Sequence, residues 1–424
     1  MKLIVQIPVL NEAATIAAVI RDIPRAIPGV DSVEVLIIDD GCTDDTVEIA
    51  LAHGADFVVR HTGRKGLARA FQTGIDTALR RAIAGTLARN VPASYTNIAL
   101  MTAFLLDFGA ARFREPAWQA KSEQLAAKIL QRFRANRTFD EYNSPTYYAI
   151  DLYALALWRS YASSPALRAA GAEMEAALWS DIAQFYHAGM RNLAGPYDRS
   201  YGMDMRHYVA GVGMWIWLAS GYARAPFPDL SQPFEHAWDF AIAPLVALLG
   251  AQIPPEALPY FLAFQGERQV ERVIAAEPRR VAIAWLGPHL MLGAQDSSSS
   301  HVMNEQFHPA TAHWQFAGEP LGWLRLRTSA PTDAWAERGR LSIVCAQPAG
   351  HDPTFVFQIA AEGVDLAALR HNHWALPGLS VRVETNAAGP PATRNRDLAE
   401  IRYTAPADGT NAPVRFTLRF EQEE

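Results

Sequence analysis

The hydrophobic period changes twice along the 424-residue chain, and this constrains the fold more than any other feature. Short apolar runs alternate with amphipathic segments up to residue 83, which is typical of alternating strands and helices. Apolar residues then recur with a helical period, and finally with a period of two. The sequence therefore predicts a multi-domain protein with a partial α/β N-terminus (1–85), an α-helical hairpin array (92–262) and a C-terminal antiparallel β-sandwich (266–424).

The first part is expected to contain a small parallel sheet. Residues 3–10 and 34–39 are continuous apolar runs that end in polar turns, as in strands buried on both faces. Residues 56–60 predict a third strand, and residues 66–84 predict a helix. Because the links between strands and helices are short, we expect the strands to be parallel and covered by helices.

The other two parts differ in their predicted elements. We expect six main helices, over residues 96–112, 118–134, 146–161, 165–190, 206–224 and 233–249. We expect at least eight strands, including residues 281–287, 311–316, 324–327, 341–346, 354–360, 379–384, 399–404 and 414–420. Four tryptophans are interpreted as core residues: Trp215, Trp217, Trp285 and Trp323.

Composition excludes several classes of protein. The formal charge of −6, without a long basic run, argues against a nucleic-acid binder. Cys42 and Cys345 are the only cysteines, so a disulfide scaffold is excluded and a cytoplasmic location is favoured. No apolar stretch reaches the ~20 residues of a membrane span, so no transmembrane segment is predicted.

The strongest local motif is LIIDDGCTDDT at residues 36–46. Asp39 and Asp40 end a predicted strand, and Gly41 allows a sharp turn before the next helix. Ligands bind at this edge of a parallel sheet, where carboxylates accept hydrogen bonds from a nucleoside or hold a divalent cation. The alternative is that Thr43 and Asp44 only cap the helix.

Residues 1–83 resemble the nucleotide-sugar-binding half of a family 2 glycosyltransferase with the GT-A (Rossmann-like) fold. The matching elements are Ile7-Pro8, Asn11-Glu12, residues 38–46, Gly54-Ala55, residues 66–70 and Gly74. The resemblance implies that a nucleotide-diphospho-sugar contacts Pro8, Asn11, Glu12, Asp39 and Asp40. It implies Mg²⁺ or Mn²⁺ as cofactor if this half is functional, but the Asp-x-Asp metal motif of the family is not found and Cys42 replaces its usual serine.

Two polar clusters, FDEYNSPTYY (139–148) and GPYDRSYGMDMRH (195–207), precede predicted helices. Aromatic faces beside carboxylates, amides and guanidinium groups suit a sugar site. The candidate catalytic residues are Glu141, Asn143, Tyr147, Tyr197, Arg199, Tyr201, Asp204 and His207. The alternative is ordinary helix capping, with Ser144 as the cap and Pro145 in the first turn.

These residues allow two mechanisms. Hydrolysis would pair one carboxylate, from Asp140 or Glu141, with a second one from Asp198 or Asp204. Elimination by a lyase would use Asn143 and Arg199 to neutralise a uronate carboxylate. Protons would then be moved by Tyr147, Tyr197, Tyr201 or His207.

A helical array followed by a sandwich resembles the α/α-toroid polysaccharide lyases and their glycosidase relatives. This resemblance implies a cleft between array and sandwich that binds a polysaccharide or oligosaccharide, although the array has too few helices for a complete toroid. No metal site is predicted there, because the spacing of His301, His308 and His313 fits no zinc motif.

Three functions remain open from the sequence. A carbohydrate-cleaving enzyme, lyase or hydrolase, is favoured. The alternatives are a family 2 glycosyltransferase and an inactive fusion of two partial domains. The abrupt change of pattern near residues 84–92, without a flexible linker, favours two partial domains joined directly.

Overall fold

The computed structural model describes residues 2–297, 305–316, 320–346, 353–389, 391–406 and 412–422. The chain divides into two compact units. The first consists of Met1–Val91 with Gly109–Glu115, and the second of Pro92–Phe108 with Pro116–Glu424. His301 and most of the serine run 297–300 lie outside the described residues.

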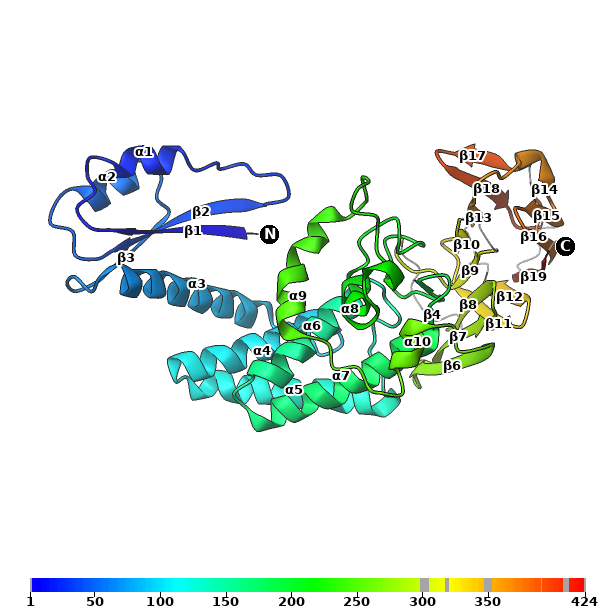
Figure 1. Cartoon of the computed structure of the whole chain (residues 1–424), viewed down its shortest axis with the longest axis horizontal. Helices are drawn as coiled ribbons and strands as arrows, with labels where there is room; N and C mark the ends of the chain where they lie inside the picture. Colours follow the sequence, from blue (N-terminus) through cyan, green and yellow to red (C-terminus); the bar gives the residue numbers. More distant parts are fainter. Residues whose placement is uncertain are drawn as a thin grey trace. The chain divides into compact units, whose positions relative to one another are not determined.

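The first unit is a three-layer α/β structure. Its parallel sheet has the order β1-β2-β3, with helices α1 and α2 on one face and α3 on the other (Figure 1). The elements are β1 (Lys2–Val9), α1 (Ile16–Arg21), β2 (Ser32–Asp39), α2 (Thr46–Ala52), β3 (Phe57–Arg60) and α3 (Leu67–Arg89). Alternate residues of β2 serve the two faces: Val35 and Ile37 pack with α1 and α2, while Leu36 and Ile38 pack with Ala70 of α3.

The second unit begins with packed helices, the first of which, α4, has its last residues (109–113) in the first unit. They are α4 (Thr96–Phe113), α5 (Pro116–Asn136), α6 (Tyr147–Tyr161), α7 (Pro165–Phe185), α8 (Gly211–Ser220), α9 (Ala243–Leu249) and α10 (Leu258–Leu262). Two 3₁₀ segments (Tyr222–Arg224 and Ala237–Ile242) and a short hairpin, β4 (Tyr186–His187) with β5 (Asn192–Leu193), lie between them. Gly171 allows α7 to approach α6 closely, since a Cβ there would lie 2.6 Å from the Cβ of Trp158.

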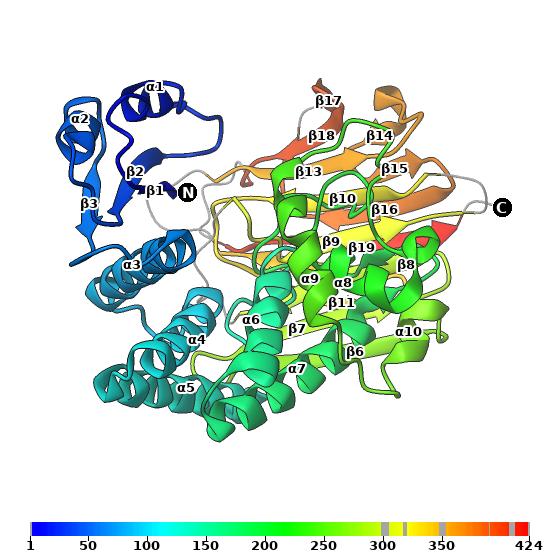
Figure 2. The ribbon, with the colours of Figure 1, turned by 60° about the vertical axis from the view of Figure 1, so that its left-hand side comes forward.

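Two antiparallel sheets follow, and buried residues from both form one core (Figure 2). The eight-stranded sheet has the order β17-β18-β13-β10-β9-β8-β7-β6, and the six-stranded sheet has the order β11-β12-β19-β16-β15-β14. The strands are β6 (Arg268–Ala275), β7 (Arg280–Leu286), β8 (Leu290–Asp296), β9 (Ala310–Trp314), β10 (Gly322–Arg327), β11 (Thr332–Glu337), β12 (Arg340–Cys345), β13 (Phe355–Ala360), β14 (Leu369–Arg370), β15 (His373–Leu376), β16 (Leu379–Thr385), β17 (Thr393–Asn395), β18 (Leu398–Tyr403) and β19 (Val414–Gln422). A 3₁₀ turn (Leu366–Ala368) precedes β14.

The predicted order of an α/β region, a helical middle and a region of antiparallel sheets is confirmed. The toroid and sandwich assignments stay predictions. Within the described ranges, no helix is both long and apolar enough to cross a membrane.

Several predicted helix boundaries are wrong. The helix expected over 206–224 begins only at Gly211 and ends at Ser220. Residues 207–209 pair instead with Glu235, which accepts the N–H of Val209 at 3.0 Å and donates its own N–H to the carbonyl of His207 at 3.3 Å. The helix expected over 165–190 ends at Phe185, and the β4–β5 hairpin begins at the next residue. The helix expected over 233–249 is a 3₁₀ segment followed by α9.

Candidate functional site

The strand-end aspartates of the first unit are bound by the loops around them. One oxygen of Asp39 accepts the N–H groups of Gly41 (3.0 Å) and Cys42 (2.7 Å). Asp40 accepts the N–H groups of Lys65 and Gly66, each at 2.7 Å, and contacts Nδ1 of His61 at 2.8 Å.

These hydrogen bonds set the charge of both carboxylates. Burial alone would raise the pKa of Asp39, but the donors of Cys42 and Gly41 outweigh burial and lower that pKa. The bond to His61 is the largest cause of the lowered pKa of Asp40. Both oxygens of Asp40 and one of Asp39 thus already accept N–H groups of the surrounding loops.

The other predicted nucleotide contacts lie at the same edge of the sheet. Pro8 is opposite Ile38 in the register of β1 and β2. Asn11 has a positive φ of 54°, and its side-chain oxygen accepts the N–H of Thr43 at 2.8 Å. The Glu12 carboxylate accepts the hydroxyl of Thr15 at 2.7 Å. The structure therefore brings Pro8, Asn11, Glu12, Asp39 and Asp40 to the carboxyl ends of β1 and β2.

In the second unit, Arg199 is the centre of one polar network. Its guanidinium donates to Glu141 and to the hydroxyl of Tyr147, each at 2.6 Å, and to Gln306 at 2.9 Å. The Tyr147 and Tyr201 hydroxyls are 2.8 Å apart. Burial raises the pKa of Tyr147, so its hydroxyl keeps its proton. Arg199 is thus engaged by three protein side chains.

Three other candidates, Asn143, Tyr197 and Asp198, lie in or against the 194–200 loop and bond to other groups of the protein. Asn143, buried at a positive φ of 46°, donates to the carbonyls of Ala194 (2.8 Å) and Pro196 (2.9 Å). The buried hydroxyl of Tyr197 donates to the carbonyl of Leu193. Asp198 accepts a hydrogen bond from Arg280 at 2.9 Å. The contacts of all three side chains are therefore with other groups of the protein.

Asp204 and His207 form a different arrangement. Asp204 is buried, and one of its oxygens is 2.8 Å from Nδ1 of His207, whose side chain is 79% exposed. The hydrogen bond to Asp204 is the largest cause of the raised pKa of His207. The other oxygen accepts the N–H of Arg206 at 2.8 Å. A carboxylate that orients one imidazole nitrogen leaves the second nitrogen free to move a proton.

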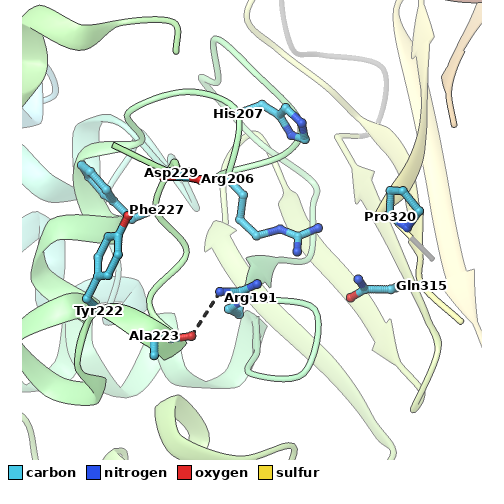
Figure 3. Close-up of a pocket in the computed structure, with 9 residues that line it drawn as sticks. All are labelled: Arg191, Arg206, His207, Tyr222, Ala223, Phe227, Asp229, Gln315 and Pro320. Atoms are coloured by element: carbon cyan, nitrogen blue, oxygen red, sulfur yellow. Dashed lines mark hydrogen bonds between the residues drawn. The ribbon is translucent and has the colours of Figure 1, made fainter. Parts of the chain in front are cut away.

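Arg206 and His207 line a pocket of about 430 Å³, here called the arginine pocket (Figure 3). Arg191 lines it as well and donates to the carbonyl of Ala223 at 3.1 Å. The Arg206 guanidinium points toward Gln315 and Pro320, two residues that lie between β9 and β10 in the sequence. Its buried Nε has no hydrogen-bond partner among the described residues, although Asp204 lies 3.6 Å away. Two guanidinium groups beside a histidine suit an anionic ligand.

A larger pocket of about 810 Å³ adjoins the arginine pocket, because His207 and Pro320 line both. We call it the carboxylate pocket, since Asp204, Glu235, Glu362 and Asp397 line it. The two pockets together are called the His207 cleft. Its walls come from loops of the helical region and from β10, β13 and β18 of the eight-stranded sheet.

Sequence reasoning identified only part of this cleft. Asp204 and His207 line it, whereas Arg206 was passed over within the same motif. Arg191 follows no motif, and only the fold brings it beside Arg206. The prediction of a core position is wrong for Trp217 and Trp323, which are half-buried, and Trp323 lines the carboxylate pocket. Among the described residues, no group of three or more histidine, cysteine or acidic side chains could hold a metal ion.

Comparison with known families places three matches along the chain. Residues 4–85 match the model of glycosyl transferase family 2, so the N-terminal resemblance is confirmed. Residues 58–251 and 267–414 match two domains of unknown function, DUF8769 and DUF8770. No curated protein and no solved structure matches the chain.

Proposed function

We propose that this protein cleaves an acidic polysaccharide by β-elimination in the His207 cleft. In this proposal the helices form an incomplete toroid and the two sheets a β-sandwich, with the cleft between them. One observation carries the proposal: His207, oriented by the buried Asp204, lies where the arginine pocket meets the carboxylate pocket.

The chemistry follows from the groups around that histidine. Arg191 and Arg206 bind the carboxylate of a uronate, which makes the proton on the adjacent carbon more acidic. The free nitrogen of His207 removes this proton. The electron pair forms a carbon–carbon double bond, the glycosidic C4–O bond breaks, and His207 returns the proton to the leaving oxygen. The products are an unsaturated uronate end and a new free hydroxyl.

Hydrolysis is less well supported by the same geometry. It needs two carboxylates that face the substrate. Glu141 binds Arg199 at 2.6 Å, and Asp140 binds Arg132 at 2.8 Å. Asp198 binds Arg280 at 2.9 Å, and Asp204 contacts His207 at 2.8 Å. Each predicted hydrolytic carboxylate therefore has a protein partner, which favours elimination.

The proposal is tested with a panel of uronate polysaccharides and the ultraviolet absorbance of the unsaturated product. We expect absorbance to increase with at least one polymer, and His207→Ala to slow the increase by about 10²–10⁴-fold. His53→Ala, which removes an exposed histidine in the first unit, is the matched control and should leave the rate unchanged. No unsaturated product from any polymer, or an unchanged rate in His207→Ala, rules out the proposal.

A second candidate function belongs to the first unit. The match of residues 4–85 to glycosyl transferase family 2, together with the five predicted contacts at one sheet edge, supports binding of a nucleotide-diphospho-sugar. The test is a thermal shift with UDP- and GDP-sugars, with and without Mg²⁺ or Mn²⁺. We expect stabilisation that Asn11→Ala removes, because Asn11 joins the two loops at that edge. No shift with any of these ligands excludes this function.

A further inference from the structure

A third pocket, of about 600 Å³, lies at one end of the two sheets. We call it the sheet-end pocket. Its lining comes from both sheets: the β7–β8 hairpin, the β11–β12 turn, the start of β16 and the end of β19. It shares no lining residue with the His207 cleft. A pocket of this size can hold a small molecule or one or two sugar rings.

Aromatic rings fixed over glycines form one wall of this pocket. The Trp285 ring covers Gly287, where a Cβ would lie 2.5 Å from the ring. The Phe316 ring covers Gly378 in the same way, also at 2.5 Å. His289 adds a third ring, with its centroid 5.6 Å from that of Phe316. Rings held on the backbone in this way keep flat apolar faces in place without the entropy cost of ordering them on binding.

Charged side chains that line the pocket have ion-pair partners in it or beside it. Arg340 contacts Glu337 at 3.1 Å, and Arg419 contacts Glu384 at 3.2 Å. Arg338 contacts Glu267 at 3.3 Å, and Glu421 accepts from Arg382 at 3.1 Å. Each arginine has a carboxylate beside it, so the pocket offers donors and acceptors without a large excess of one charge.

One of these polar groups lacks a partner. The Nε of Arg340 is buried and has no hydrogen-bond partner among the described residues. A buried N–H group without a partner costs free energy, and a ligand oxygen could satisfy it. This group lies on the same turn as Gly339, whose positive φ of 62° brings its carbonyl to the N–H of Phe420 at 2.8 Å.

We propose that the sheet-end pocket binds one or two units of a neutral polysaccharide chain. The apolar face of a sugar ring packs on Phe316 and His289, and its hydroxyls bond to the Arg340–Glu337 pair. A neutral ligand is favoured because the lining arginines are already paired with carboxylates of the protein. This inference does not depend on the proposed elimination.

The test is calorimetric titration of the whole protein with cellohexaose, mannohexaose, xylohexaose and a hexagalacturonate of the same length. We expect at least one neutral chain to bind more tightly than the uronate chain. Phe316→Ala should weaken this binding about tenfold or more, since it removes a stacking face. Arg340→Met tests the polar half of the pocket and should weaken the same ligand.

Two control variants locate the bound chain. Trp335→Ala removes a ring that is 39% exposed on β11 but does not line the pocket, so binding should be unchanged. His207→Ala should slow elimination yet leave neutral-chain binding intact. The inference is overturned if no neutral chain binds, if Phe316→Ala binds as the parent protein does, or if only His207→Ala loses binding.

Discussion

At the scale of single residues, Asp204 decides what His207 can do. An imidazole must be neutral before it accepts a proton, and the hydrogen bond that its Nδ1 donates to the Asp204 carboxylate raises the pKa of His207 above its usual 6.5. The rate of elimination should therefore increase as pH rises through that raised pKa. Asp204 also fixes which nitrogen of the ring carries the proton, because it contacts Nδ1.

Asp204→Asn should change the rate and its pH dependence together. Without the carboxylate the pKa of His207 falls, so the acidic limb of the pH–rate profile moves to lower pH. We expect the rate above that limb to fall by about 10²–10⁴-fold, since the ring loses its orientation. Initial rates between pH 5 and pH 9 measure both effects. Asp22→Asn, at an exposed carboxylate of the first unit, is the control, and an unshifted limb in Asp204→Asn contradicts the prediction.

Substitution of two arginines of one motif, Arg199 and Arg206, should affect different properties of the protein. Arg206 lines the arginine pocket, so Arg206→Ala should raise KM for a uronate substrate about 10-fold or more with little loss of thermal stability. Arg199 binds Glu141 and Tyr147, so Arg199→Ala should instead lower Tm, because it leaves the buried Glu141 carboxylate without its cation. Steady-state kinetics and thermal melts separate them. Equal KM effects in both variants contradict the assignment.

Asp151 of α6 is buried, and neither of its oxygens has a hydrogen-bond partner among the described residues. Burial, with the nearby Glu141 charge, raises its pKa well above 3.8, so the folded protein holds a proton that the unfolded chain releases. Stability is therefore lost as pH rises from 3.8 towards the folded pKa, by about 1.4 kcal/mol per unit. Asp151→Asn keeps the shape of the protonated acid and should remove this loss. Urea unfolding at pH 5 and pH 8 tests this prediction. The free energy of unfolding of the variant, relative to that of the parent protein, should be larger at pH 8 than at pH 5. The same difference at both pH values contradicts the prediction.

At the scale of elements, the packing of α6 on α7 depends on Gly171. A Cβ there would lie 2.6 Å from the Cβ of Trp158 and 3.0 Å from the backbone nitrogen of Arg159. Neither atom can move without moving α6, so Gly171→Ala should destabilise the protein by about 1–3 kcal/mol. Gly85→Ala in α3 meets nothing within 4 Å and should stabilise by about 0.5–1 kcal/mol. Urea unfolding measures the free energy of unfolding of both variants. If this free energy changes in the same direction in both, the packing explanation is contradicted.

The elements that sequence reasoning located best are those with a long periodic pattern. The helix expected over 146–161 is α6 (Tyr147–Tyr161), and the strand expected over 399–404 is β18 (Leu398–Tyr403). Short elements such as β4 (Tyr186–His187) were not predicted, because two residues are too few to show a hydrophobic period. The start of α8 was predicted too early for a different reason. Residues 207–209 form hydrogen bonds with Glu235, which is distant in the sequence, and no local pattern predicts such tertiary bonds.

The difference between local patterns and tertiary contacts also explains which residues of the candidate site the sequence predicts. Asp204 and His207 were found because they stand three residues apart in a motif rich in polar and aromatic groups. Arg191 could not be found, because its part in the arginine pocket depends on the β4–β5 hairpin bringing it beside Arg206. The roles predicted for Asn143 and Arg199 stay predictions, because composition does not reveal which protein groups these side chains contact.

At the scale of the whole molecule, the join between the α/β part and the helices is a recurring feature. The DUF8769 match begins at residue 58, within β3, and continues through α3 to residue 251. A family model that crosses residues 84–92 counts against a chance fusion at that point. The end of α4 also packs in the first unit, where Arg112 binds Asp76 at 2.8 Å and Arg80 lies 3.8 Å from the centroid of the Phe113 ring.

Removing the first unit tests whether the two halves act separately. All residues of the His207 cleft lie between Arg191 and Leu398, so a protein of residues 92–424 should keep kcat/KM for elimination while losing any thermal shift with nucleotide-sugars. Its Tm should fall, because Phe113 and Arg112 lose their partners on α3. A protein of residues 58–424, which begins where the DUF8769 match begins, should recover part of that loss, because it restores α3 together with most of β3. Loss of elimination in a folded 92–424 protein, judged by circular dichroism, means that the first unit takes part in catalysis.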